Sequence, residues 1–122
     1  MTKEIDFSAF SPTDYRYAVD ALRDYLSEEA YVRYKAKVEA ALAQVLEKRG
    51  IVKRELCDEI VAATSSITAE EVYEEEKRTK HDIRALVKVI QSKVSDEAKP
   101  FVHLGATSYD VVDTANALRY KD

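Results

Sequence analysis

The sequence has 122 residues, of which 46% are hydrophobic and 34% are charged, which suits one domain with a modest core and argues against disorder. The formal net charge of −4 argues against a general nucleic-acid binder, because phosphate neutralisation requires clustered cations. Only 2 glycines and 2 prolines interrupt the chain, which leaves little room for hairpins and predicts an all-α fold with long helices.

Cysteine usage and hydropathy indicate the environment of the protein. Cys57 is the only cysteine, so no internal disulfide is possible, and the surrounding helical pattern predicts a small buried side chain. The first residues lack the apolar run of a signal peptide, and no stretch approaches the ~20 apolar residues of a membrane span. We therefore expect a soluble, cytoplasmic protein without a membrane partner.

The first part of the chain predicts a short helix at 18–25 and then a long one. Ser27 is a suitable N-cap, the acidic residues after it suit the positive end of the helix dipole, and Gly50 is a natural stop. Between them, apolar residues recur at steps of three and four, which predicts one inward stripe. The stripe consists of Tyr31, Tyr34, Val38, Ala41, Leu42 and Val45.

The middle of the chain predicts a helix at about 53–65 and another that opens at Thr68 with a capping box. The second of these is acidic first and basic last, which complements the helix dipole and predicts i,i+4 ion pairs. A break is expected near 79–82. A new apolar stripe then predicts a further helix with Ile83, Leu86, Val87, Ile90 and Val94 inward.

The last part of the chain predicts an extended loop at 101–106, which contains Gly105, and then a helix that begins with a second capping box at Thr107. This helix carries an apolar strip that we expect to be exposed and suited to helix pairing. The strip consists of Val111, Val112, Ala115 and Leu118.

The triplet Lys80-His81-Asp82 is the first candidate site. On a helical projection, His81 lies opposite the apolar stripe that follows it and near Arg84 and Lys88. It should therefore face water or a ligand, where its imidazole could donate a hydrogen bond or a proton near neutral pH, and the cations would favour an anion. An ordinary surface histidine explains the same pattern.

The segment His103–Ser108 is the second candidate. Gly105 permits close approach of backbone to a ligand, and Thr107 and Ser108 offer hydroxyls and free N–H groups at a helix N-terminus, where a carboxylate or phosphate can bind. A loop that ends in a routine helix cap explains the same residues.

The pair Arg16-Tyr17 is the third and weakest candidate, because a guanidinium fork and a hydroxyl can bind an oxyanion but also serve ordinary packing. No Walker loop, dinucleotide fingerprint, nucleophile elbow or zinc-ligand spacing occurs, so no metal site is expected. The residues alone thus indicate a helical domain with an anion site and no defined reaction.

Three stretches carry a distinctive combination of residues: Ser11–Tyr17, Glu74–Asp82 and Val102–Thr114. The second ends in a basic residue followed by His-Asp, and the third contains His-x-Gly-x-Thr-Ser-x-Asp and Asp-Thr. Together they resemble the adenylosuccinate lyases of the fumarase/aspartase superfamily, over nearly the whole chain from Ser11 onward. The resemblance implies the all-α, N-terminal helical domain of that superfamily.

The resemblance also implies a reaction. Such enzymes eliminate fumarate from adenylosuccinate to give AMP, and from a succinyl-carboxamide ribonucleotide earlier in purine synthesis, without a cofactor. The reaction requires a base, an acid and anion clamps. By resemblance, Lys80, His81 and Asp82 hold the nucleotide substrate, with His81 near the phosphate and supporting the acid–base chemistry.

The remaining roles follow from the same resemblance. Arg16 and Tyr17 would contact the nucleotide, and His103 would help to form the site. Thr107 and Ser108 would bind the succinyl part of the substrate.

The resemblance divides the chain into an N-terminal domain at 1–110 and, at 111–122, the first turns of a long central-domain helix. The final helical pattern reaches Asp122 without a cap, which agrees with this division. The family's second conserved histidine and its mobile serine loop have no counterpart here, and its active sites combine residues from several subunits of a homotetramer. We therefore expect the chain by itself to be inactive.

Two other functions fit the sequence. Another lyase of the superfamily could act on a different succinyl adduct such as argininosuccinate, although Arg16-Tyr17 and Lys80-His81-Asp82 favour the purine enzyme. A helical interaction module without catalysis would reuse the same domain for binding.

Overall fold

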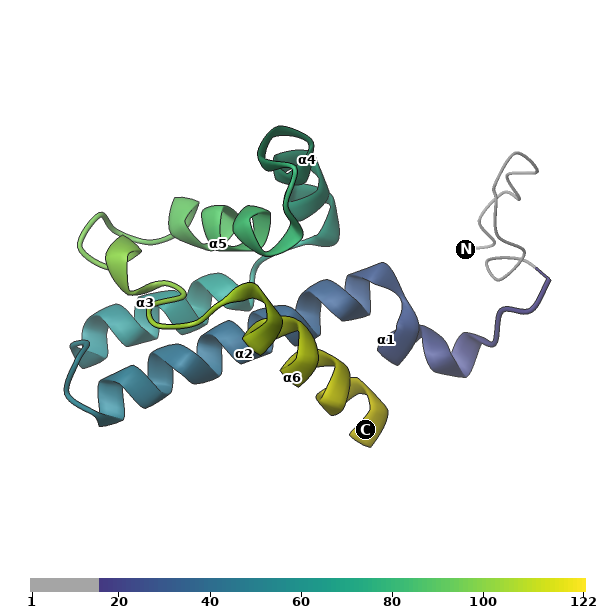
Figure 1. Ribbon diagram of the computed structural model, residues 1–122, viewed down its shortest axis with the longest axis horizontal. Helices are drawn as coiled ribbons and strands as arrows, with labels where there is room; N and C mark the ends of the chain where they lie inside the picture. Colours follow the sequence, from purple (N-terminus) through teal and green to yellow (C-terminus); the bar gives the residue numbers. More distant parts are fainter. Residues whose placement is uncertain (1–15) are drawn as a thin grey trace.

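The computed structural model describes residues 16–122, and within that range it is built from helices and connecting turns without strands (Figure 1). This confirms the all-α prediction. None of the described helices is long and apolar enough to cross a bilayer. In chain order the elements are η2 (Asp20–Leu22), α1 (Arg23–Leu26), α2 (Glu28–Lys48), α3 (Arg54–Thr64), α4 (Ala69–Thr79), α5 (Asp82–Ser92), η3 (Lys99–Phe101) and α6 (Ser108–Lys121).

The longest helix, α2, begins and ends where its sequence predicts. The Ser27 hydroxyl accepts a hydrogen bond from the backbone N–H of Ala30 at 3.1 Å, which satisfies one of the free donors of the first turn. At the other end Gly50 has a φ of +72°, a left-handed conformation that suits glycine and turns the chain away from the helix axis.

The predicted inward stripe of α2 is only partly correct. Tyr34 is buried, but Ala41 and Val45 are exposed, and Val45 keeps 52% of its surface accessible. Val32 and Ala43 are buried instead. The reason is that α2 packs against α3 and α4 and also against α6, so that a single stripe cannot describe its buried surface (Figure 1).

The main core lies between α2, α3 and α5, with α4 packed along α5 (Figure 1). Leu56 and Ile60 of α3 are buried in the same cluster as Leu86 and Ile90 of α5, and the last two are inward as the sequence predicts. Cys57 is 4% exposed in the same cluster and burial raises its thiol pKa, which confirms the expected small buried side chain.

The α5 stripe is broader than the sequence predicts. Ile83, Leu86 and Ile90 are buried as expected, but Ala85 and Val89 are buried as well. The two other predicted members, Val87 and Val94, are only partly buried and pack at the edge of the core. Because α5 packs against α4 and also contacts α3 and α6, its buried face is wider than one row.

The charged helix α4 begins at the predicted capping box. The hydroxyl of Thr68 accepts from the backbone N–H of Glu71 at 3.2 Å, and the Glu71 carboxylate accepts from the N–H of Thr68 at 2.9 Å. The predicted i,i+4 ion pairs Glu74/Arg78 and Glu76/Lys80 are wrong. The pairs that form are i,i+3, Lys77 with Glu74 at 2.6 Å and Arg78 with Glu75 at 2.5 Å. Lys80 has already left the helix, since its φ is +55°.

The last helix, α6, packs across α2 (Figure 1). The prediction that its apolar strip is exposed is wrong, because Val111 and Ala115 are fully buried, and Val112 and Leu118 are partly buried. Ala115 and Leu118 contact a cluster on α2 that contains Tyr34. The exposed apolar side chains of α6 are instead tyrosines, of which Tyr120 is 76% exposed.

Candidate functional site

The break between α4 and α5 places the Lys80-His81-Asp82 triplet on the surface. The backbone N–H of Lys80 donates to the carbonyl of Glu76 at 2.8 Å and ends α4, and the left-handed φ of Lys80 turns the chain. His81 is extended, with φ −153°, and α5 begins at the next residue. The predicted break at 79–82 is therefore correct, and it leaves Lys80 and His81 exposed.

His81 is the N-cap of α5, a role that the sequence does not predict. Its Nδ1 atom accepts a hydrogen bond from the backbone N–H of Arg84 at 3.2 Å. An accepting ring nitrogen carries no proton, so the neutral imidazole is protonated on Nε2. Since the side chain is 49% exposed, this Nε2–H group can donate to a ligand, in agreement with the predicted outward orientation.

Asp82 is held by a buried lysine of α2. The Nζ atom of Lys35 lies 3.3 Å from Oδ2 of Asp82, and it also lies 3.7 Å from the ring centroid of Tyr31. Burial opposes ionisation of Asp82, but the backbone N–H of Ile83 and the Lys35 ammonium outweigh it and lower the carboxyl pKa. Asp82 is therefore a fixed anion at the start of α5, where the helix dipole also favours it.

His103 is held by a second buried residue of α2. Its Nδ1 atom lies 2.6 Å from Oε1 of Glu39, whose side chain is fully buried. Burial raises the pKa of Glu39, and His103 opposes that rise. The backbone of His103 has a φ of +64°, a strained conformation for a residue with a side chain, of the kind found at functional sites.

Lys35 and Glu39 therefore join both candidate segments to one helix. They are four residues apart on α2, which places them about 6 Å apart along the helix axis on one face. Neither residue is predicted from its local sequence. The available signal is an i,i+4 pair of opposite charges, which is also common on solvated helices.

Thr107 and Ser108 open α6, and Thr107 is its N-cap. The Asp110 carboxylate accepts from the backbone N–H of Thr107 at 2.9 Å, which agrees with the predicted capping box. Asp110 thus places one negative charge at this helix end. A ligand anion would share the end with Asp110 and would depend on the hydroxyls of Thr107 and Ser108.

Arg16 and Tyr17 lie apart from the other candidates. The purple segment that carries them is beyond α1, away from the α4–α5 junction and from the loop of His103 (Figure 1). Tyr17 is 67% exposed. The rest of the stretch that resembles the family, residues 11–15, is outside the described residues.

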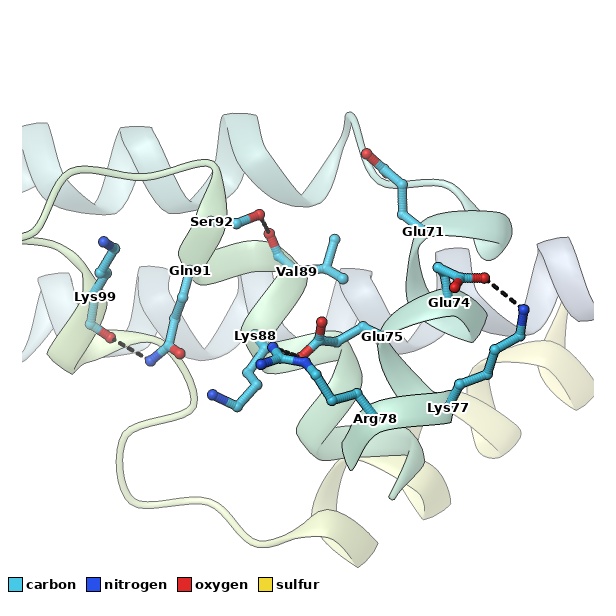
Figure 2. Close-up of a pocket in the computed structure, with 10 residues that line it drawn as sticks. All are labelled: Glu71, Glu74, Glu75, Lys77, Arg78, Lys88, Val89, Gln91, Ser92 and Lys99. Carbon is cyan, nitrogen blue, oxygen red and sulfur yellow. Dashed lines mark hydrogen bonds and ion pairs between the residues drawn. The ribbon is translucent and has the colours of Figure 1, made fainter. Parts of the chain in front are cut away.

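A groove on the described part of the chain lies outside the candidate site. It has a volume of about 900 Å³ and lies between α4 and α5 (Figure 2). Its lining is charged, but Lys77 pairs with Glu74 and Arg78 with Glu75, as the dashed lines show. The charges of these two pairs neutralise each other, and Lys99 of the lining pairs with Asp96, so most of the positive charge of the groove is already compensated.

The candidate site is suited to an organic anion. Across residues 16–122, no group of three or more His, Cys, Asp or Glu side chains is arranged to hold a metal ion. The arrangement offers an imidazole N–H at His81, an ammonium group at Lys80 and hydroxyls at Thr107 and Ser108. These groups can bind carboxylate or phosphate oxygens and move a proton.

Comparison with known proteins agrees with this chemistry, although no protein-family model matches the chain. The adenylosuccinate lyase of Methanocaldococcus jannaschii is 40% identical over 116 residues, which are 93% of this chain and 25% of that protein. The N-acetyl-S-(2-succino)cysteine lyase of Enterococcus italicus is 32% identical over 87% of this chain and 24% of that protein.

The fold is also similar to that of a solved lyase. The crystal structure of a fumarate lyase from Mesorhizobium sp. BNC1 matches 87% of this chain and 25% of its own, with a TM-score of 0.75 and 26% identity. The chain thus spans about a quarter of the length of the relatives it matches. Over that quarter, the chain is a homologue of the adenylosuccinate lyases and has the helical fold of the fumarase/aspartase superfamily.

Proposed function

We propose that the polypeptide carrying this sequence eliminates fumarate from adenylosuccinate to give AMP, and from the succinyl-carboxamide ribonucleotide of purine synthesis. The observation that carries the proposal is the 40% identity to an adenylosuccinate lyase over 93% of the chain. The exposed Nε2–H of His81 and the fixed anion of Asp82 beside it supply chemistry of the required kind.

The proposed roles follow the reaction. The elimination removes a proton next to a carboxylate and protonates the departing nitrogen, so it needs acid–base groups and anion clamps and no cofactor. His81 donates from Nε2 near the phosphate and supports the acid–base chemistry. Lys80 and Asp82 hold the substrate, and His103 forms part of the site wall.

The two remaining pairs act as clamps. Thr107 and Ser108 bind the succinyl part through their hydroxyls at the start of α6, and Arg16 and Tyr17 contact the nucleotide. Since Arg16 and Tyr17 lie beyond α1, they would serve a site through movement of this segment or on another subunit. The second possibility agrees with a homotetrameric enzyme of the cytoplasm, which we also propose.

A second candidate function is elimination of fumarate from a different succinyl adduct. The specific observation in its favour is the 32% identity to an N-acetyl-S-(2-succino)cysteine lyase. Both substrates carry the succinyl group that Thr107 and Ser108 would bind, but only adenylosuccinate carries the phosphate proposed to lie near His81.

A substrate panel separates these functions. The natural polypeptide that carries this sequence is incubated with adenylosuccinate, argininosuccinate and N-acetyl-S-(2-succino)cysteine, and fumarate release is measured. We expect turnover of adenylosuccinate alone. Turnover of only one of the other two substrates would identify that adduct as the substrate. No turnover of any of the three would favour a non-catalytic module.

The 122-residue polypeptide is the matched control in the panel. Both of its histidines already have proposed roles, and the family's second conserved histidine and serine loop are not among its residues. We therefore propose that it releases no fumarate by itself. Measurable turnover by the purified 122-residue polypeptide would contradict this.

A further inference from the structure

Glu39 is buried more deeply than its chemistry favours. Its side chain has no exposed surface, and within residues 16–122 its Oε1 atom is paired with His103 while its Oε2 atom has no hydrogen-bond partner. A buried carboxyl group with an unsatisfied oxygen costs stability, and an apolar residue of similar size would avoid that cost. A role that depends on its charge or hydrogen bond would explain why glutamate occupies this position.

The partner of Glu39 is constrained as well. His103 has a φ of +64°, and its side chain is 20% exposed, so that one part of the ring is enclosed and another can reach a ligand. The 2.6 Å contact to Glu39 is made by Nδ1. The strained backbone and the short contact together fix the position of the ring.

We propose that Glu39 is a positioning residue that accepts a hydrogen bond from Nδ1–H of His103 and so leaves Nε2 of the neutral imidazole without a proton. An ionised carboxylate can only accept, so its partner atom must carry the proton. Burial raises the pKa of Glu39, but its 2.6 Å contact to His103 opposes that rise and favours the ionised form.

The two histidines of the site then have opposite tautomers. His81 accepts through Nδ1 from Arg84 and presents an Nε2–H donor, whereas His103 donates through Nδ1 to Glu39 and presents an Nε2 acceptor. In terms of the proposed function, on which this step rests, His81 would donate to an oxyanion of the substrate. His103 would accept from a hydroxyl or N–H group of the same nucleotide adduct.

Nitrogen NMR of the 122-residue polypeptide tests the proposal directly. Because the sequence contains only 2 histidines, long-range ¹H–¹⁵N correlation spectra resolve the tautomer of each ring. The spectra are recorded at a pH at which an ordinary imidazole is neutral. Two variants are compared with the wild type: E39L removes the acceptor at similar size, and E39Q keeps an acceptor oxygen without the charge.

We expect the Nδ1–H tautomer for His103 in the wild type and in E39Q, and a shift towards Nε2–H in E39L. His81 should show Nε2–H in all three and is the internal control. A wild-type His103 protonated on Nε2, or an unchanged His103 spectrum in a folded E39L, would overturn the proposal. If E39L does not fold, the wild-type tautomer still decides.

This outcome is independent of the lyase assay. The Nδ1–H tautomer without any fumarate release would overturn the proposed function and leave the positioning role of Glu39 intact. Fumarate release together with an Nε2–H tautomer of His103 would support the proposed function and overturn the positioning role of Glu39.

Discussion

Lys35 and Asp82 join two helices across 47 positions of the sequence, with Nζ and Oδ2 3.3 Å apart. The two partners differ in their access to water, because the side chain of Lys35 is 10% exposed and that of Asp82 is 43% exposed. The cost of losing the pair therefore depends on which charge remains.

We expect D82N to destabilise the 122-residue polypeptide more than K35M. D82N leaves a buried ammonium without its counterion and removes an anion from the start of α5, which should cost about 1–2 kcal/mol. K35M leaves a carboxylate that water can reach and fills the space with an apolar chain, which should cost less than about 1 kcal/mol. Urea unfolding at neutral pH measures both values. Equal costs, or a larger cost for K35M, would contradict the assignment of Lys35 as the buried partner.

The two covered sides of α2 give a prediction about packing. Val32 is 5% exposed and Val45 is 52% exposed, although both are valines of the same helix. V32A should lower the free energy of unfolding by roughly 1–3 kcal/mol, because it removes buried methyl groups. V45A is the matched control and should stay within about 0.5 kcal/mol of the wild type. A larger loss of stability for V45A than for V32A in urea unfolding would instead support the single inward stripe that the sequence predicts.

The two roles of His81 can be separated by substitution. H81A removes the cap of α5 and should cost about 1 kcal/mol of stability, whereas H81N retains a capping side chain and should recover most of that loss. Neither variant retains an imidazole, so both should lose lyase activity in the natural polypeptide. Thermal unfolding measures the first effect and fumarate release the second. An H81N as unstable as H81A would show that the contact to Arg84 does not cap the helix.

Acid should weaken the capping box of α4. The hydrogen bond from Lys93, followed by the one from the Thr68 N–H, lowers the pKa of Glu71 in the folded state. A lowered folded pKa contributes stability above the unfolded value of about 4.3, and the contribution is lost as the pH falls through the folded pKa. Since the side chain is 42% exposed, the effect should be below about 1 kcal/mol.

The comparison of E71Q with the wild type tests this. The stability difference in urea unfolding should be constant above about pH 5 and shrink as the pH falls below the unfolded value. E70Q is the matched control, because Glu70 is in the same turn and makes none of the capping contacts. A stability difference that grows on acidification would mean that folding raises the pKa of Glu71.

The helices were largely predictable because their ends are local features. Ser27, Thr68 and Gly50 act through hydrogen bonds or backbone conformation within a few residues, and each end lies where the sequence predicts. Buried faces depend on which helices pack together, and periodicity does not contain that information. For this reason the apolar pattern predicts Val45 inward and Ala115 outward, and both predictions are wrong.

The candidate site was predictable only in part. The outward orientation of His81 follows from a helical projection, and the structure agrees with it. The contacts of Asp82 and His103 to α2 join residues 47 and 64 positions apart, and no local pattern connects such positions. Lys35 and Glu39 carry the charges that fix the site, yet in the sequence they resemble an ordinary solvated pair.

Fumarate release from adenylosuccinate by the natural polypeptide, measured for the wild type and H81Q, tests the central claim most directly. The claim is that this chain supplies acid–base chemistry to an adenylosuccinate lyase through His81. We predict turnover by the wild type and a loss of roughly a hundredfold or more in H81Q, the size expected for a lost proton-transfer group. Equal turnover by H81Q and the wild type would contradict the claim.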